Sequence, residues 1–353
     1  MAEQPLRIVD ADAIAAALTY PVLVEALRAA FRADIAVPVR HHHTIPQAGR
    51  DATLLLMPAW TDAHVPAKWS PVRRKGHAPK DESGSRPGTG RDPEGAAADR
   101  FLGCKIVTVF PDNAAAAQPS VHGRYLLMSG ATGAPLALMD AQALTAWRTA
   151  AASALAASYL ARADAEHLVM IGAGALAPHL VRAHTAVRPI RRVTLWNRTH
   201  GRAVALAFGL TVTGIEATIA DDLETAVREA DIVCCATLAT EPIVRGAWLK
   251  PGAHVDLVGG FTPKMREADN DAIKRARVYV DTRAGAGQEA GDIVAPLRRG
   301  ILTQKGIRGD LFELCRGKAK GRTSDKQITL FKSVGSAIED LAAAMLVWRS
   351  STA

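Results

Sequence analysis

Apolar side chains recur at helical spacing near the start of the chain, at Ile14, Leu18, Val22, Leu27 and Phe31. This pattern predicts a helix over residues 10–33 that covers the edge of a first domain. Short apolar runs follow at 52–60 and 104–111, and again at 124–130 and 135–140 on either side of a turn that contains Gly and Pro. Such hairpin-like spacing predicts a mixed or antiparallel sheet.

The pattern changes in the second half of the chain. Residues 144–161 are rich in alanine and predict a helix that packs closely on a sheet. After residue 166, short apolar runs alternate with helix-compatible stretches: ETAVREA precedes DIVCCAT, AWLKPG precedes HVDLVG, and IKRAR precedes VYVDT. Strands separated by helices at this spacing are typical of a parallel, doubly wound sheet. The tail QITLFKSVGSAIEDLAAAMLVWR predicts a strand, a glycine turn and a helix that returns to the first domain.

These elements predict an α/β protein of two domains. A Rossmann-type domain with a doubly wound parallel sheet is expected over 148–315, and a discontinuous α+β domain over 1–147 and 316–353. Residues 71–100 are rich in Gly, Pro and charge and have almost nothing that could enter a core. We interpret them as a disordered insert in the first domain, with a functional lid as the alternative.

The composition fits a soluble enzyme. Apolar residues make up 48% and charged residues 22% of the 353 positions, which is ordinary for a globular protein of this size. No apolar run approaches the roughly 20 residues that span a bilayer, and the first residues lack a signal-peptide core, so we expect a cytoplasmic protein. The net charge of +8 is spread without a basic run, so it indicates neither nucleic acid nor membrane as a partner. Four cysteines without CxxC spacing indicate reduced thiols, not disulfides or a zinc site.

A glycine motif inside a strand-helix-strand unit is the strongest functional signal. An apolar run ending at Ile171 is followed by Gly172, Gly174 and Ala177, then by a helix-compatible stretch and a second apolar run. In a dinucleotide-binding unit, the first glycine permits the turn and the second lets the backbone approach a pyrophosphate. The third small residue lets helix and sheet pack closely. We therefore expect a dinucleotide at this turn, held by Gly172, Gly174, Ala175 and Leu176.

The end of the second strand bears on which dinucleotide binds. An acid there usually accepts hydrogen bonds from the ribose of NAD, but this chain has Asn197, Arg198 and Thr199. A guanidinium fork suits a 2'-phosphate, which a carboxylate would repel. NADPH is therefore the expected cofactor and NADH the second choice, unless Arg198 is only a solvated surface residue.

Six segments resemble, in order, the ornithine cyclodeaminase and mu-crystallin family of dinucleotide-dependent enzymes: LTAWRTAAASALAASYLA, IGAGALAPH, LWNRT, ADIVCCAT, WLKPGAHVDLVGG and ITLFKSVGSAIEDLA. The resemblance covers nearly the whole chain apart from the insert. It implies a homodimer, a central nucleotide domain, and a substrate-binding and dimerisation domain built from both chain ends. It also places Ser120, Thr237 and Ser333 near the cofactor, although each could equally be a cap or turn residue.

In the family that the chain resembles, three cationic residues hold the substrate carboxylate. The matching positions here are Arg40, Lys105 and Arg148. The chemistry agrees, because a carboxylate needs cationic donors fixed on rigid elements. Lys105 in an apolar strand and Arg148 in an alanine-rich helix would be costly to bury unpaired. Arg40 could instead be a surface arginine next to three histidines.

Two positions depart from the family's cyclodeaminases. Those enzymes carry an acid after the double glycine of the VGG segment and a glutamate two residues before the Met-Pro pair, whereas this chain has Phe261 and Leu55. Without these acids, deamination with cyclisation of ornithine is disfavoured. Leu55 and Phe261 are instead expected to form an apolar wall of the substrate site, suited to a ring of methylenes.

The resemblance then implies the family's other branch, which reduces cyclic ketimines such as Δ1-pyrroline-2-carboxylate and Δ1-piperideine-2-carboxylate to proline and pipecolate. Lys105 and Arg148 are the expected catalytic residues. His43 is the first candidate for the proton donor, with His122 and a bound water as alternatives.

Other functions and ligands remain open at this point. An alanine or N-alkyl amino acid dehydrogenase would use the same carboxylate grip. A protein of another class, resembling mu-crystallin, would only bind NADPH or a small ligand. His41 to His43 are reminiscent of a metal cluster, but no paired spacing supports them, and no metal is expected.

Overall fold

The computed structural model describes residues 5–61 and 100–351. Most strands of its first sheet are antiparallel, in the order β1-β7-β6-β5-β4-β2, with β3 paired to β4. Only β1 runs parallel to its neighbour. The strands are β1 (Arg7–Val9), β2 (Ile35–Ala36), β3 (His41–Ile45), β4 (Ala52–Thr61), β5 (Phe101–Val109), β6 (Val121–Ser129) and β7 (Pro135–Asp140). The predicted hairpins are thus confirmed, whereas β1, β2 and β3 are short or polar and gave no clear pattern.

The second sheet is parallel throughout, in the order β10-β9-β8-β11-β12-β15-β13-β14. Its strands are β8 (His167–Ile171), β9 (Arg192–Trp196), β10 (Ala217–Ile219), β11 (Ile232–Cys235), β12 (His254–Leu257), β13 (Arg277–Val280), β14 (Ile307–Asp310) and β15 (Thr329–Lys332). The order reverses direction between β8 and β11, as in doubly wound sheets. The expected α/β fold with a Rossmann-type sheet is confirmed.

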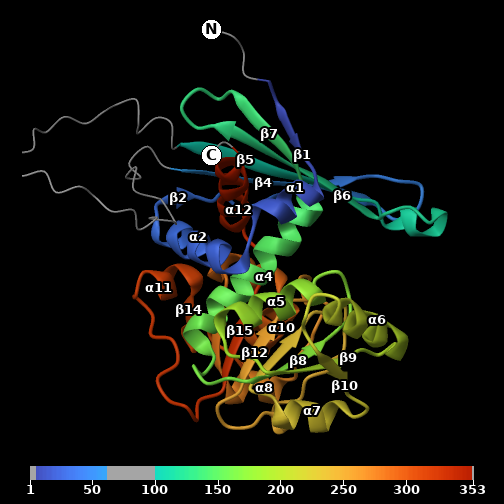
Figure 1. Ribbon diagram of the computed structural model, residues 1–353, viewed down its shortest axis with the longest axis vertical. Coiled ribbons are helices and arrows are strands. Elements are labelled where there is room, and N and C mark those ends of the chain that lie inside the picture. The colour runs from blue at the N-terminus through green and yellow to red at the C-terminus, as the bar shows by residue number, and fades with distance from the viewer. Residues whose placement is uncertain (1–4, 62–99, 352–353) are drawn as a thin grey trace, which may run out of the picture.

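Two groups of helices accompany the sheets. Those of the second sheet are α5 (Ala177–Val187), α6 (His200–Thr211), α7 (Leu223–Glu229), α8 (Asn270–Arg275), α9 (Arg283–Glu289), α10 (Gly291–Arg298) and α11 (Leu311–Cys315), with short 3-10 turns η2 (Gly246–Trp248) and η3 (Gln304–Gly306). Figure 1 shows the others on one side of the first sheet, toward the second: α1 (Ala11–Ala17), α2 (Tyr20–Arg32), α4 (Ala141–Leu160) and α12 (Ala337–Ser350). The turn η1 (Pro111–Ala116) follows β5. The helix α12 packs on β4, β5 and α4, and α4 also packs on α5, β12 and β15, so α4 joins the two halves.

One expected boundary does not hold. The division after residue 315 assigned the last strand to the first domain, but β15 lies between β12 and β13 in the second sheet. All four residues of β15 are buried, as a central strand of a covered parallel sheet requires. Only α12 returns to the first sheet, so the chain crosses from one half to the other at 333–336.

The helix predicted over residues 10–33 is two helices. The pair α1 and α2 is bent by 85°, and Pro21 lies in the first turn of α2. A proline at that position is compatible with a helix start but blocks continuation of the helix before it. Among the described residues no single helix is long and apolar enough to cross a membrane, although this bent pair passes on length and composition.

Two further expectations concern the insert and the cysteines. Residues 71–99 of the expected insert lie outside the described part of the chain. All four cysteines are free thiols, three of them buried, as expected.

Candidate functional site

Lys105 and Arg148 meet above the start of α12. Lys105 lies in the middle of β5 and is only 4% exposed, and Arg148 lies on α4 and is 5% exposed. The Lys105 Nζ is 2.8 Å from Asp340 Oδ2, and Arg148 Nε donates to Asp340 Oδ1 at 3.0 Å. Arg148 Nη1 also donates to Glu339 Oε2 at 2.7 Å. One buried carboxylate therefore joins the two cations that were expected to hold the substrate.

Arg40 reaches the same place from the segment before β3. Its Nη2 donates to the Gly335 carbonyl oxygen at 2.5 Å, and its Nε lies 3.2 Å from Glu289 Oε1. Gly335 has a φ of +83°, and a Cβ there would lie 2.3 Å from Arg148 Nη1. A glycine is needed here for both backbone and space. The structure thus brings Arg40, Lys105 and Arg148 together around the loop that enters α12.

Burial is the largest influence on the pKa values of Lys105, Glu339 and Asp340. Desolvation lowers the pKa of Lys105 to about 8, although Asp340 opposes the shift. Burial alone would raise the pKa of Asp340, but the charges of Lys105 and Arg148 outweigh it and hold that pKa below its ordinary value. Burial raises the pKa of Glu339 to about 7, with Asp281 and Asp340 adding to the effect against Arg148. Burial therefore brings the pKa of Glu339 close to neutral pH, and burial also raises the pKa values of Asp281 and Glu289.

The four acids of this cluster were not predicted from the sequence: Asp281, Glu289, Glu339 and Asp340. A signal for two of them existed, because Glu339 and Asp340 interrupt an otherwise apolar helix. Buried cations require buried counter-charges. The need for partners of Lys105 and Arg148 could have led to this acidic pair.

A cavity of about 460 Å³ opens beside Arg40, between the two sheets. Its lining includes Arg40, Met57, Glu289 and Gly335, together with apolar side chains such as Phe312. Lys105 and Arg148 lie behind Gly335 and are not among its lining residues. We place the candidate substrate site at the meeting of the three cations, because their chemistry decides what can bind there, and the cavity gives access on the Arg40 side.

The predicted dinucleotide turn lies at the carboxyl edge of the second sheet. Gly172 has a φ of +103°, and a Cβ there would lie 2.5 Å from the Ala236 carbonyl oxygen. A Cβ on Gly174 would meet nothing within 4 Å, and Gly174 and Ala175 are exposed. No side chain caps the start of α5 at Leu176. The Ala177 N–H donates to the Gly174 carbonyl oxygen at 3.0 Å and Pro178 has no N–H, so a pyrophosphate would be held by the exposed turn and the positive end of the helix dipole. These features fit a dinucleotide.

Asn197 links the glycine turn to the end of β9. Its Oδ1 accepts a hydrogen bond from the Ala173 N–H at 3.2 Å, and its Nδ2 donates to the Thr199 carbonyl oxygen at 2.8 Å. Arg198 and Thr199 are exposed beside it. The geometry therefore leaves the guanidinium of Arg198 accessible to a ligand at the glycine turn.

Thr237 and the loop after β12 are held by a second buried acid, Glu267, that the sequence did not reveal. Glu267 Oε1 accepts hydrogen bonds from the N–H and Oγ1 of Thr237 at 2.7 and 3.0 Å. Its Oε2 accepts the N–H groups of Gly259 and Gly260 at 2.7 and 3.3 Å. The fully buried Lys332 Nζ lies 3.9 Å from the same carboxylate. Glu267 thus fixes the carboxyl ends of β11 and β12 relative to each other.

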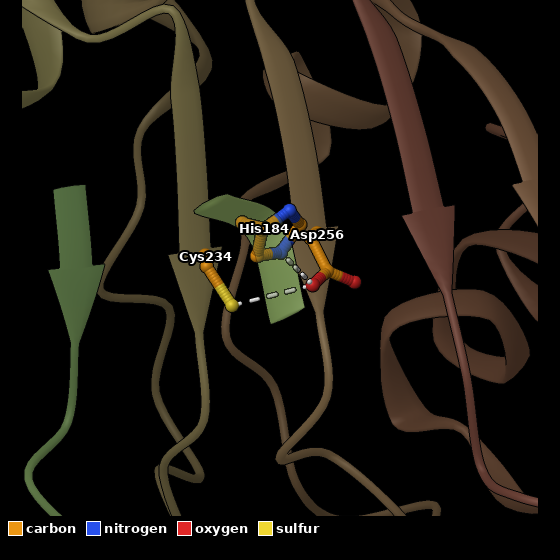
Figure 2. A group of neighbouring side chains, drawn as sticks. All are labelled: His184, Cys234 and Asp256. Carbon is orange, nitrogen blue, oxygen red and sulfur yellow. Dashed lines mark hydrogen bonds and ion pairs between the residues drawn. The ribbon is translucent and has the colours of Figure 1, made fainter. Parts of the chain in front are cut away.

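Another polar group lies deeper, between α5 and the second sheet (Figure 2). His184 Nε2 and Cys234 Sγ approach Asp256 Oδ2 at 3.1 and 3.2 Å, and Ser153 Oγ donates to Asp256 Oδ1 at 3.1 Å. The group offers three ligand-type atoms within 4.8 Å of one another among the described residues, whereas structural zinc sites use four. Burial and Asp256 raise the pKa of Cys234, so the thiol stays a hydrogen-bond donor. We interpret the group as a satisfied buried carboxylate that fastens α4 and α5 to the sheet.

Comparison with known proteins decides the family. The sequence profile of the ornithine cyclodeaminase/mu-crystallin family matches residues 92–353. The chain belongs to this family. It is 38% identical to Protein SAR DEFICIENT 4 of Arabidopsis thaliana over 98% of both chains. It is 44% identical to the Δ1-pyrroline-2-carboxylate reductase of Paracoccus denitrificans over 70% of this chain and 78% of that protein. Among solved structures, it is similar to the Δ1-pyrroline-2-carboxylate reductase of Thermococcus litoralis in complex with NADH and L-proline, with 29% identity, a TM-score of 0.82 and 98% of each chain covered.

The two departures from the family's cyclodeaminases lie in different halves of the molecule. Leu55 is half-buried on β4, where it pairs with Val107 and so faces the same side of the first sheet as Lys105. Phe261 follows the Glu267-bound loop of the second sheet and is 48% exposed. The apolar wall that Leu55 and Phe261 were expected to form stays a prediction.

The register of the first sheet corrects the expected proton donor. His43 pairs with Leu54, Leu54 with Thr108, and Thr108 with His122. This row faces away from Lys105, because alternate residues of a strand point to opposite faces. Neither His43 nor His122 therefore reaches the cationic cluster within this chain.

Two residues that the resemblance placed near the cofactor lie differently. Ser120 precedes β6 in the first sheet, where its carbonyl oxygen accepts the Phe110 N–H, and the structure does not join it to the glycine turn. Ser333 follows β15 at the carboxyl edge, is 2% exposed and donates its N–H to the Leu257 carbonyl oxygen. Ser333 and Thr237 thus share the edge with the glycine turn.

Proposed function

We propose that this family member reduces cyclic ketimines, Δ1-pyrroline-2-carboxylate to L-proline and Δ1-piperideine-2-carboxylate to L-pipecolate. The observation that carries the proposal is the convergence of Arg40, Lys105 and Arg148 at the carboxyl edge that also bears the dinucleotide turn. The chain is an oxidoreductase of the kind that acts on C=N bonds, and two of its relatives carry the name of the first reaction.

The reaction needs little from the protein beyond positioning. When bound, the reduced nicotinamide supplies a hydride to the imine carbon, and the imine nitrogen takes a proton. Arg40 and Arg148 bind the carboxylate and fix the plane of the ring, because a guanidinium fork sets orientation as well as charge. Lys105, whose pKa burial lowers to about 8, donates to the same ligand. Their burial strengthens these interactions relative to water.

The preferred cofactor is NADPH, with NADH as the alternative. Arg198 supports this choice, because it is exposed directly after β9, where an acid would favour NAD. The Thermococcus litoralis protein holds NADH, which supports a nicotinamide dinucleotide without deciding between the two.

We further propose that the protein is a cytoplasmic homodimer that joins through the outer face of the first sheet. The helices of the described residues cover only the other face (Figure 1), and the outer face bears exposed apolar side chains at Ile8, Trp60 and Ile106. Exposed apolar side chains gathered on one face of a sheet are typical of a protein interface. Its ligands would be the imino acid and the dinucleotide, with neither nucleic acid nor membrane as a partner.

A coupled absorbance assay tests the function. Each ketimine is offered with NADPH and with NADH, and compared with pyruvate plus ammonia or methylamine as substrates of an open-chain dehydrogenase. We expect dinucleotide oxidation with the ketimines and much less with pyruvate. Faster turnover of pyruvate would make the protein an alanine or N-alkyl amino acid dehydrogenase. Binding of NADPH without turnover of any of these would favour a mu-crystallin-like binding protein.

A further inference from the structure

We infer that Glu339 takes up a proton when the substrate carboxylate binds, and that this proton goes to the imine nitrogen. The inference rests on the proposed function and names the proton source, which the sequence assigned to a histidine. It follows from the position of Glu339 beside Arg148 and from the balance of charge in the cluster.

Glu339 has one oxygen engaged and one without a partner. Its Oε2 accepts the Arg148 hydrogen bond at 2.7 Å, while its Oε1 is buried and meets no hydrogen-bond donor among the described residues. The side chain is fully buried. Buried polar atoms without partners are rare in folded proteins, and a carboxylate oxygen of this kind is relieved by a proton. Oε1 is the atom that would hold it.

The charges around Glu339 favour that proton once a ligand arrives. Arg40, Lys105 and Arg148 are paired with Glu289, Asp340 and Glu339. Asp281 adds a fourth acid close to the same loop, since its Oδ2 accepts the N–H groups of Val334 and Gly335 at 2.7 Å. A bound carboxylate adds a further negative charge to a cluster that already holds more acids than bases. In a buried site, protonation of one acid is the least costly response.

Glu339 is the acid best placed to respond. Asp340 contacts two cations, Lys105 and Arg148, which hold its pKa below the ordinary value. Burial raises the pKa of Asp281, but both of its oxygens already accept backbone N–H groups, so neither is left without a partner for a proton to occupy. Glu289 is about one-fifth exposed. Glu339 has a single cationic partner, and burial together with Asp281 and Asp340 raises its pKa to about 7. A ligand carboxylate beside Arg148 would raise that pKa further.

The proton balance of the reaction then closes within the site. A neutral ketimine gains a hydride at carbon and a proton at nitrogen to become a secondary amine. The carboxylic acid of Glu339 loses its O–H proton to that nitrogen and returns to the carboxylate that pairs with Arg148. The next ketimine carboxylate restores the proton from solvent.

Calorimetry can count this proton. The protein with its dinucleotide is titrated with pyrrole-2-carboxylate, a flat carboxylate whose ring nitrogen is not basic, in two buffers of different ionisation enthalpy. Because Glu339 is mostly ionised above its pKa, we expect uptake on the order of one proton at about pH 8 and much less at about pH 6. Glu339→Gln keeps an oxygen for Arg148 but cannot titrate, so it should bind without uptake. Glu289→Gln, a matched acid on Arg40, should keep the uptake.

The pH profile of reduction gives the second readout. With Δ1-pyrroline-2-carboxylate, Glu339→Gln should lower kcat by about 10²-fold, the usual contribution of a positioned acid, and remove the fall of kcat above neutral pH. Equal proton uptake in wild type and Glu339→Gln would overturn the inference, as would a wild type that reduces the ketimine yet binds the carboxylate with no uptake. In that last case the proposed function stands. If no ketimine is reduced, both fail.

Discussion

Arg148 and Lys105 are buried residues that each already pair with a carboxylate. A substrate carboxylate would bind the same two cations. Asp340 accepts hydrogen bonds from both cations, so neither is left uncompensated when the site is empty of substrate. Breaking a buried pair by removing one member is costly. Any test of these cations must therefore separate ligand binding from folding.

Replacing Lys105 with Met should raise the KM for the ketimine by about 10- to 100-fold, the value of one charge-assisted hydrogen bond. The Kd of the dinucleotide should change much less, because Lys105 is on the other sheet. Asp340 keeps Arg148 as a partner, so the fold should survive. The double variant Lys105→Met with Asp340→Asn provides the control for stability in thermal unfolding. An unchanged KM would remove Lys105 from the substrate site.

Replacing Arg198 with Asp should shift preference from NADPH toward NADH. A carboxylate repels the 2'-phosphate and can accept hydrogen bonds from the ribose. The ratio of kcat/KM for the two dinucleotides should move by about 10- to 100-fold, with Arg202→Asp on α6 as a nearby control. A ratio that does not move would leave Arg198 as a surface residue.

The sequence could predict the cations of the site but not the acids. Lys105 and Arg148 stand out as charges in apolar segments, whereas Asp281 follows a strand and Glu267 lies in a loop before a helix, as many acids do. Their roles depend on which strand ends lie side by side, which a single sequence does not contain. His43 was misplaced for a related reason: β3 carries three histidines in a row, and only the register tells which of them faces the site.

At the scale of elements, the loop from β15 to α12 positions the cationic cluster. Gly335 is the residue of this loop that lies against the Arg148 guanidinium. Gly335→Ala should destabilise the protein by about 2–4 kcal/mol, because it combines a strained positive φ with a Cβ against Arg148. Gly214→Ala has a similar φ of +81° in open space and should cost only about 1 kcal/mol. Denaturant unfolding measures both. Equal losses would show that the contact with Arg148 is of no consequence.

Glu267 holds the loops after β11 and β12 in position. We therefore expect this acid to support dinucleotide binding without contacting the dinucleotide itself. Glu267→Gln places an amide N–H₂ against backbone donors and should weaken dinucleotide binding by roughly 10-fold or more, with a loss of about 1–3 kcal/mol in stability. The exposed Glu241→Gln is the matched control. Fluorescence titration with NADH and thermal unfolding report the two effects. Wild-type affinity in Glu267→Gln would mean that the loops hold their positions without it.

Elements were predictable where their pattern is strong and less so where the chain changes sheets. The antiparallel hairpins and the strands β8, β9, β11, β12 and β13 follow from apolar runs and turns, whereas β10 was not predicted and β15 was assigned to the wrong half. Its sequence shows a buried strand, yet nothing local says that it inserts between β12 and β13. Helix α2 separates from α1 because of Pro21, a signal that was present but was outweighed by the continuous apolar spacing.

At the scale of the whole molecule, the helices α1, α2, α4 and α12 lie between the two sheets (Figure 1), and no helix of the described residues covers the other face of the first sheet. On the outer face of the first sheet, Ile106 is 39% exposed and Trp60 40% exposed. A monomer would leave this apolar face in water, which is unfavourable. The same face carries His43 and His122, so a partner subunit would cover these histidines as well.

A single charge on that face should therefore separate the subunits. Ile106→Asp places a carboxylate in the middle of the proposed interface, where burial without a partner is costly, and should convert a dimer into a monomer by light scattering after size-exclusion chromatography. Val204→Asp puts the same charge on α6, at a position that is 46% exposed, and should leave the dimer intact. The monomer should keep its dinucleotide affinity, because the glycine turn lies wholly within one chain. If Ile106→Asp stays dimeric, the subunits join through another surface, and the outer face of the first sheet must be covered in some other way.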